Sequence, residues 1–166
     1  MTCENCFLHQ KIKECQEFCD TRRTIPVEDK KGSNKKWTFS NPKNKCVCLI
    51  KIDGCVITDS ISNSKRCDHL FLVCDETEKS AFFVELKGSD LGGALKQFSK
   101  TIPFLQEYLT GFCLYARIAL SKVRTQEFGN SNTKKTKEKI ESLLQQKGCN
   151  SRKPLVYSNS STSETI

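Results

Sequence analysis

The order of short apolar segments constrains the fold of this chain more than any other feature of its sequence. Apolar runs of strand length occupy residues 46–52, 55–58, 67–74, 81–87 and 112–120. An amphipathic helix is expected before the last run, over about residues 90–105, because its apolar residues recur at helical spacing. This order predicts an α/β fold in which a mixed central sheet is flanked by helices, one on each face.

The segments on either side of these runs define the expected domain organisation. Residues 5–20 carry an apolar stripe that predicts a first helix, and residues 133–147 read as a basic helix with little apolar surface. A chain of 166 residues suits one domain. We expect an N-terminal helix and basic loop over residues 1–45, a core over 46–121, a basic helix within 122–150 and a disordered tail over 151–166.

The charge of the chain is distributed unevenly. Residues 1–45 hold ten Lys/Arg and six Asp/Glu, which gives +4; residues 46–121 hold eight and nine, which gives −1; residues 122–166 hold nine and four, which gives +5. These values sum to the net charge of +8. A near-neutral centre with basic flanks favours a polyanionic partner, although lysine-rich flanks also serve solubility alone.

Eleven cysteines occur in the chain. An odd count, together with a start that lacks an apolar signal-peptide core, predicts reduced thiols and a cytoplasmic protein. No apolar run has the length of a membrane span, so no membrane association is expected. Four of the thiols have a spacing that suits a structural zinc ion, and these are Cys3, Cys6, Cys15 and Cys19. The alternative is that Cys15 and Cys19 belong to the apolar face of the first helix.

The run over residues 81–87 contains a charged pair that needs an explanation. Glu85 and Lys87 lie two residues apart, so they share one face of a strand whose other residues are apolar. Burial of either charge without a partner is costly. A divalent cation would offset the cost if a second carboxylate lay nearby, and Asp68, which opens the preceding strand, can reach that position across a hairpin.

The combination of Asp68, sixteen intervening residues and Glu85-Leu86-Lys87 resembles the signature of the PD-(D/E)xK nuclease superfamily. The resemblance covers roughly residues 5–120 and implies a restriction-endonuclease-like fold with an α-β-β-β-α-β core. It also implies that Asp68, Glu85 and the main-chain carbonyl of Leu86 bind Mg²⁺ or Mn²⁺, and that Lys87 acts on the attacking water. Cys67 occupies the position of the proline in the family name.

Further site residues follow from the resemblance or from charge. Some members of the superfamily place a glutamine on the helix after the ExK strand, which implies a catalytic role for Gln97. Many use a glutamate on the first helix, for which both Glu17 and Glu14 are available. Lys65 and Arg66 precede Asp68 and are positioned to contact a phosphate, although a solvated loop would also carry such residues.

These features together predict a Mg²⁺-dependent nuclease that hydrolyses DNA, rather than RNA, through an Asp/Glu-x-Lys metal site. A homodimer is expected if both strands are cut, because one small domain cuts one strand at each site. Two alternatives stay open. One is a catalytically silent module of the same fold that binds nucleic acid or protein, and the other is a small zinc-stabilised regulator.

Overall fold

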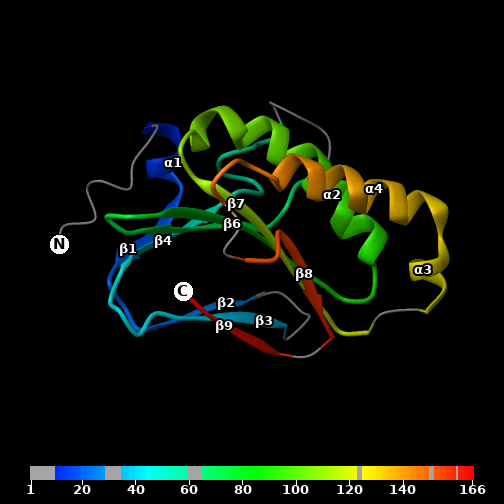
Figure 1. Cartoon of the computed structure of the whole chain (residues 1–166), viewed down its shortest axis with the longest axis horizontal. Coiled ribbons are helices and arrows are strands. Elements are labelled where there is room, and N and C mark those ends of the chain that lie inside the picture. The colour runs from blue at the N-terminus through cyan, green and yellow to red at the C-terminus, as the bar shows by residue number, and fades with distance from the viewer. Residues whose placement is uncertain (1–9, 29–34, 60–64, 123–124, 150–151, 160) are drawn as a thin grey trace.

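A six-stranded mixed sheet lies at the centre of the molecule, as the computed structural model shows (Figure 1). The structure describes residues 10–28, 35–59, 65–122, 125–149, 152–159 and 161–166. The strands, in their order across the sheet, are β1 (Gln16–Asp20), β4 (Cys46–Lys51), β5 (His69–Cys74), β6 (Lys79–Lys87), β7 (Cys113–Leu120) and β8 (Leu155–Ser158). Neighbours are antiparallel from β1 to β6 and parallel from β6 to β8.

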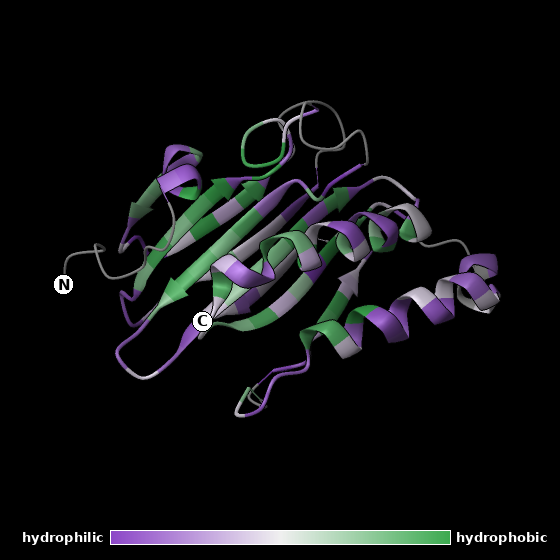
Figure 2. Cartoon of the chain, turned by 90° about the horizontal axis from the view of Figure 1, so that it is seen from above, coloured by the Kyte–Doolittle hydropathy of each residue, from purple (hydrophilic) through white to green (hydrophobic). Residues whose placement is uncertain are grey.

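All helices whose packing the structure describes contact the same face of this sheet. They are α1 (Gln10–Glu14), α2 (Leu91–Leu105) and α4 (Ser131–Leu144), and each contributes buried residues to one apolar core with that face. Seen from above, one long helix, α2, crosses the sheet, and α4 runs beside it toward the edge of the sheet (Figure 2). A 3₁₀ turn (Gln106–Leu109) and a short helix, α3 (Thr125–Gly129), complete the helical elements.

A second, three-stranded sheet covers the opposite face. It consists of β2 (Thr24–Glu28), β3 (Lys36–Ser40) and β9 (Thr162–Thr165), with β2 antiparallel and β9 parallel to β3. Trp37 and Phe39 project from β3 into a separate core, where the ring of Phe39 stacks on Phe71 at 4.2 Å between centroids. The expectation of helices on both faces is therefore wrong, because apolar residues of β2 and β3 cover the second face instead.

The α/β class and the mixed sheet are confirmed. The chain contains α1, β4, β5, β6, α2 and β7 in the predicted order, and β7 is buried along its whole length as a central strand. The first helix is much shorter than predicted within the described residues, because the chain leaves α1 after Glu14 and forms β1. Phe18 and Cys19 then face opposite cores, which gives strand rather than helix periodicity.

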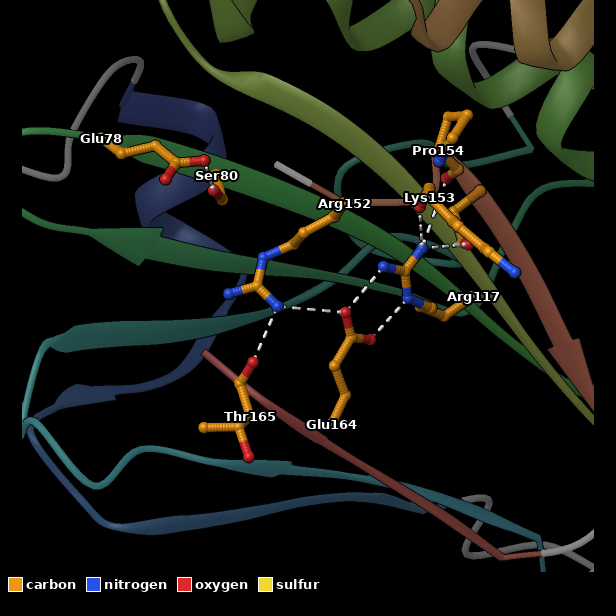
Figure 3. A network of polar contacts seen from close by, with 9 residues as sticks. Glu78, Ser80, Arg117, Arg152, Lys153, Pro154, Glu164 and Thr165 are labelled. Atoms are coloured by element: carbon orange, nitrogen blue, oxygen red, sulfur yellow. Dashed lines mark hydrogen bonds and ion pairs between the residues drawn. The ribbon is translucent and has the colours of Figure 1, made fainter. Parts of the chain in front are cut away.

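The C-terminal segment is ordered, which contradicts the expected disordered tail. Arg117 on β7 is 1% exposed and donates through Nε and Nη2 to the carboxylate of Glu164 on β9, at 2.5 and 2.7 Å (Figure 3). Arg152 reaches the same carboxylate at 3.4 Å and the carbonyl of Thr165 at 2.7 Å. These ion pairs, with strand pairing of β8 and β9, offset the ordering entropy of a polar segment.

The cysteines differ from their predicted state. Disulfides join Cys15 to Cys55, Cys19 to Cys48 and Cys113 to Cys149. Cys46 and Cys74 are also disulfide-bonded, and Cys67 is the free thiol of the described residues. The expectation of reduced thiols is therefore wrong for this structure, and such bonds are typical of oxidising compartments rather than of the cytoplasm. Within the described residues, no helix combines the length and apolar character needed to cross a membrane.

Candidate metal centre at the ends of β5 and β6

The start of β5 and the end of β6 bring Asp68 and Glu85 together. His69 pairs with Val84 in the antiparallel register, so the next pair along the strands is Asp68 with Glu85. Two hydrogen bonds join the strand ends: the backbone N–H of Asp68 donates to Glu85 Oε2 at 3.0 Å, and the N–H of Leu86 donates to Asp68 Oδ2 at 2.9 Å. The predicted convergence of these two carboxylates is what the strand register produces.

Lys87 completes the cluster from the same face of β6. Its Nζ lies 2.9 Å from Glu85 Oε1, and no further donor among the described residues reaches this oxygen. Glu85 is fully buried, whereas the Lys87 side chain is 27% exposed. The ammonium therefore has access to solvent while it contacts a carboxylate that has none.

Electrostatics at Glu85 are unfavourable for its charged form. Burial and, after it, the charge of Asp68 raise the pKa of Glu85, Lys87 offsets only part of the increase, and the resulting pKa is about 8. Burial lowers the pKa of Lys87, but the hydrogen bond and charge of Glu85 outweigh this, so its pKa is raised overall. One ammonium does not neutralise two neighbouring carboxylates, and the oxygen-rich donor set suits a hard divalent cation.

Helix α2 holds the segment that leads into Asp68. Asp90 caps the helix by accepting a hydrogen bond from the N–H of Gly93 at 2.7 Å. Gln97, which is 5% exposed, donates from Nε2 to the carbonyl of Arg66 at 2.5 Å, and Thr101 Oγ1 accepts from the N–H of Cys67 at 3.0 Å. Gln97 therefore contacts backbone through Nε2 rather than a carboxylate, and its catalytic role stays a prediction.

The two basic residues before Asp68 have different environments. Arg66 is 5% exposed and binds Asp53 at 3.1 Å, Asp59 at 2.6 Å and the carbonyl of Ile57 at 3.0 Å. In this structure its guanidinium binds the turn after β4, so the predicted phosphate contact would require these ion pairs to open. Lys65 is exposed and remains available for such a contact.

Cys67, which stands where the superfamily has proline, is a buried free thiol. Burial raises its pKa well above the ordinary value, and the charges of Glu85 and Asp68 add to the increase. The thiol therefore stays protonated and is not a nucleophile.

Two cavities are lined by predicted site residues, one by Asp68 and the other by Gln97 and Lys65. The first, of about 530 Å³, is lined by Asp68, Leu86 and His69 of β5, together with residues of β1 and β4 and the segments that follow them, among them Glu17, Lys51 and Asp53. The second, of about 630 Å³, lies between α2 and the start of α4 and is lined by Gln97 and three lysines, Lys65, Lys96 and Lys100. Acidic residues thus face the first cavity near Asp68, and the second is lined by the three lysines together with two acids, Asp90 and Glu127.

The first-helix acids are placed differently from the prediction. Glu14 ends α1, is exposed and accepts a hydrogen bond from Gln10 at 3.3 Å. Glu17 lies on β1 rather than on a helix, and its Oε1 is 3.6 Å from His69 Nε2. The pairing of β1 with β4 brings Glu17 to the cavity of Asp68, and no local pattern in the sequence signals that pairing.

The predicted zinc ligands do not form one group. Cys15 bonds to Cys55, and Cys19 lies in a different sulfur cluster with Cys46 and Cys48, which could hold a metal ion. Cys3 and Cys6 lie outside the described residues. Cys19 is separated from the other predicted ligands because β1 pairs with β4 and places Cys19 opposite Cys48.

Comparison of the chain with protein-family models, with curated proteins and with solved structures finds no match. The resemblance to the PD-(D/E)xK superfamily therefore stays a prediction from residues and their spacing.

Proposed function

We propose that this protein is a Mg²⁺- or Mn²⁺-dependent nuclease of the restriction-endonuclease-like fold, which hydrolyses phosphodiester bonds of DNA. The observation that carries the proposal is the fully buried carboxylate of Glu85, hydrogen-bonded to the backbone of a second acid and in contact with one lysine. Two ionised carboxylates at a buried position repel each other unless a cation compensates their charge.

The residues present fit a hard divalent cation. Asp68, Glu85 and the carbonyl of Leu86 would hold it, because their oxygen atoms belong to adjacent strand ends. When bound, the cation polarises the phosphodiester and activates a water molecule. Lys87 would orient that water or stabilise charge on the phosphoryl oxygens, while Gln97 and Thr101 hold the backbone before Asp68 in place.

The charge distribution supports a nucleic-acid substrate. The net charge is +8, and Lys65, Lys96 and Lys100 line a cavity on the α2 side of the cluster. Lysines in such a row bind successive phosphates of a backbone without reading the base sequence.

Metal binding and cleavage by two alanine variants test the proposal. Asp68→Ala and Glu85→Ala are each expected to abolish Mn²⁺ binding in calorimetry and cleavage of plasmid and oligonucleotide DNA. Asp75→Ala is the matched control, because Asp75 follows the opposite end of β5 and pairs with Lys45 at 3.1 Å. Unchanged Mn²⁺ affinity in both site variants would refute the metal centre.

A specific observation also favours the silent binding module. The Glu85–Lys87 ion pair and the hydrogen bonds that Asp68 makes with Glu85 and with the N–H of Leu86 satisfy part of the cluster internally. On that alternative, the wild-type protein binds DNA in the presence of Ca²⁺ but does not cleave it with Mg²⁺ or Mn²⁺. Parallel assays with RNA of the same sequence decide between the two nucleic acids.

A further inference from the structure

The cavity of about 530 Å³ beside Asp68 is lined by residues of the main sheet and of β2, an edge strand of the second sheet. Phe18, Leu49 and Leu86 contribute apolar surface from β1, β4 and β6, and Pro26 contributes it from β2. A cavity of this size, with apolar side chains and a small number of polar groups, is typical of a site for a small organic group.

Arg22 and Phe18 build a flat platform on the wall of this cavity. The guanidinium carbon of Arg22 lies 3.7 Å from the centroid of the Phe18 ring, and Arg22 Nε donates to both carboxylate oxygens of Asp20 at 2.9 Å. The ring therefore covers one face of the guanidinium, and the carboxylate occupies one of its edges. Because the Arg22 side chain is still 43% exposed, the other face is accessible to a ligand.

The backbone that carries the platform is held in place. β1 pairs with β4, and the disulfide of Cys19 with Cys48 joins the two strands next to Phe18. Asp20, which holds the guanidinium, ends the same strand. The platform is thus ordered before a ligand binds, so a planar group that stacks on Arg22 loses little affinity to side-chain ordering.

The charges of the cavity favour a neutral ligand that donates hydrogen bonds over a phosphate. Besides His69, its charged residues are four acids and two bases, namely Glu17, Glu28, Asp53, Asp68, Arg22 and Lys51. The excess of carboxylates repels a phosphate, whereas carboxylate oxygens accept hydrogen bonds from amino groups. Cytosine, adenine and guanine combine an exocyclic amino group with a flat ring that stacks on a guanidinium plane.

We propose that this cavity binds one unpaired nucleobase of a DNA strand, stacked on the guanidinium of Arg22. The inference rests on the proposed function, because Asp68, a proposed metal ligand, lines the same cavity. In a duplex both faces of a base are covered by its neighbours, so a paired base has to leave the stack before it can contact Arg22. The substrate class is therefore DNA with an unpaired nucleotide at the cleavage site.

Binding of single strands to the full chain in the presence of a chelator tests the proposal. By fluorescence anisotropy, an oligomer of deoxycytidine should bind about 10-fold more tightly than an abasic oligomer of the same length and charge. An oligomer of thymidine should bind more weakly than deoxycytidine, because thymine has no exocyclic amino group. Equal affinity for the deoxycytidine and abasic strands overturns the proposal. So does binding of free deoxycytidine monophosphate as tight as that of the strand, because the ligand is then a nucleotide and not DNA.

A variant that keeps the charge locates the base. Arg22→Lys should lose most of the preference for deoxycytidine over the abasic strand, because an ammonium has no plane to stack on. Arg23→Lys is the matched control, since Arg23 is exposed, binds Asn44 at 3.2 Å and does not line the cavity. The affinity for duplex DNA should be the same in Arg22→Lys and the wild type. An equal loss for duplex and single strand would show that Arg22 contacts phosphate, which overturns the proposal.

The base site and the nuclease fail separately in these experiments. The titrations contain no metal, so they do not depend on cleavage. A protein that prefers bases but cleaves nothing with Mn²⁺ retains the base site and refutes the nuclease. A protein that cleaves but binds abasic strands equally well does the reverse. Should Arg22→Lys fail to fold, the comparison of deoxycytidine with abasic strands in the wild-type protein decides.

Discussion

Lys87 contacts Glu85 through an ion pair of 2.9 Å but keeps partial access to solvent. On the proposed mechanism its ammonium acts on the transition state rather than on the metal, so its loss should appear in rate and not in binding. We expect Lys87→Ala to reduce single-turnover cleavage by about 10²–10³-fold while DNA binding in Ca²⁺ stays nearly unchanged. Lys79→Ala, at the other end of β6, is the matched control. Cleavage by Lys87→Ala at the wild-type rate would show that the lysine is only a strand-end charge.

Glu85 should make the stability of the metal-free protein depend on pH. Its pKa is about 8 in the folded protein against an ordinary value of 4.5, so folding favours the protonated form. The stabilising contribution is complete below about pH 4.5 and is lost as the pH rises toward 8, a loss on the order of a few kcal/mol. Thermal unfolding in a chelator across this range is the measurement.

Two comparisons isolate Glu85 as the cause. Glu85→Gln should flatten the decline in stability between pH 5 and 8, whereas Glu107→Gln, at an exposed position, should leave it unchanged. Added Mn²⁺ should stabilise the wild-type protein more at pH 8 than at pH 5, because it binds the ionised carboxylate. An equal decline in Glu85→Gln would contradict the assignment.

At the scale of elements, β9 is held to the molecule by an ion pair with one fully buried partner. Removal of Glu164 leaves the guanidinium of Arg117 buried without its carboxylate. We expect Glu164→Ala to lower the free energy of unfolding by about 3 kcal/mol, measured by urea denaturation. The exposed Glu138→Ala serves as control, since it lies on the outer face of α4.

Truncation after Asn150 should have a larger effect than the point variant, because it removes β8 and β9 together. Leu155 is buried against the helix-side core and Ile166 against the second core. A melting temperature that is unchanged on truncation would show that the two strands add nothing to stability.

At the scale of the whole molecule, the charge of +8 predicts DNA binding that depends strongly on salt. For about four phosphate contacts, the affinity should fall by about 10²-fold between about 50 and about 200 mM salt. The triple variant Lys65→Ala, Lys96→Ala and Lys100→Ala should reduce the salt slope by about three, because each lysine of the cavity binds one phosphate. Lys43→Ala, remote in the chain from that cavity, should leave the slope unchanged. If the triple variant keeps the wild-type salt slope, DNA binds outside this cavity.

The sequence by itself determined the features that depend on neighbours along the chain. Apolar runs of strand length identified β4, β5, β6 and β7, and the apolar stripe over about residues 90–105 identified α2. The short connection between β5 and β6 was enough to predict that Asp68 and Glu85 would converge, because a hairpin fixes the register of its strands.

Only the tertiary structure decided the features that depend on contacts between distant segments. The residues around Phe18 form a strand because β4 offers an open edge, and the polar tail is ordered because Glu164 meets a buried arginine 47 residues away. The side chain of Arg66 is buried and forms ion pairs with Asp53 and Asp59. Such pairings gain their energy from burial and charge contacts that form only on folding, so no local pattern of residues encodes them.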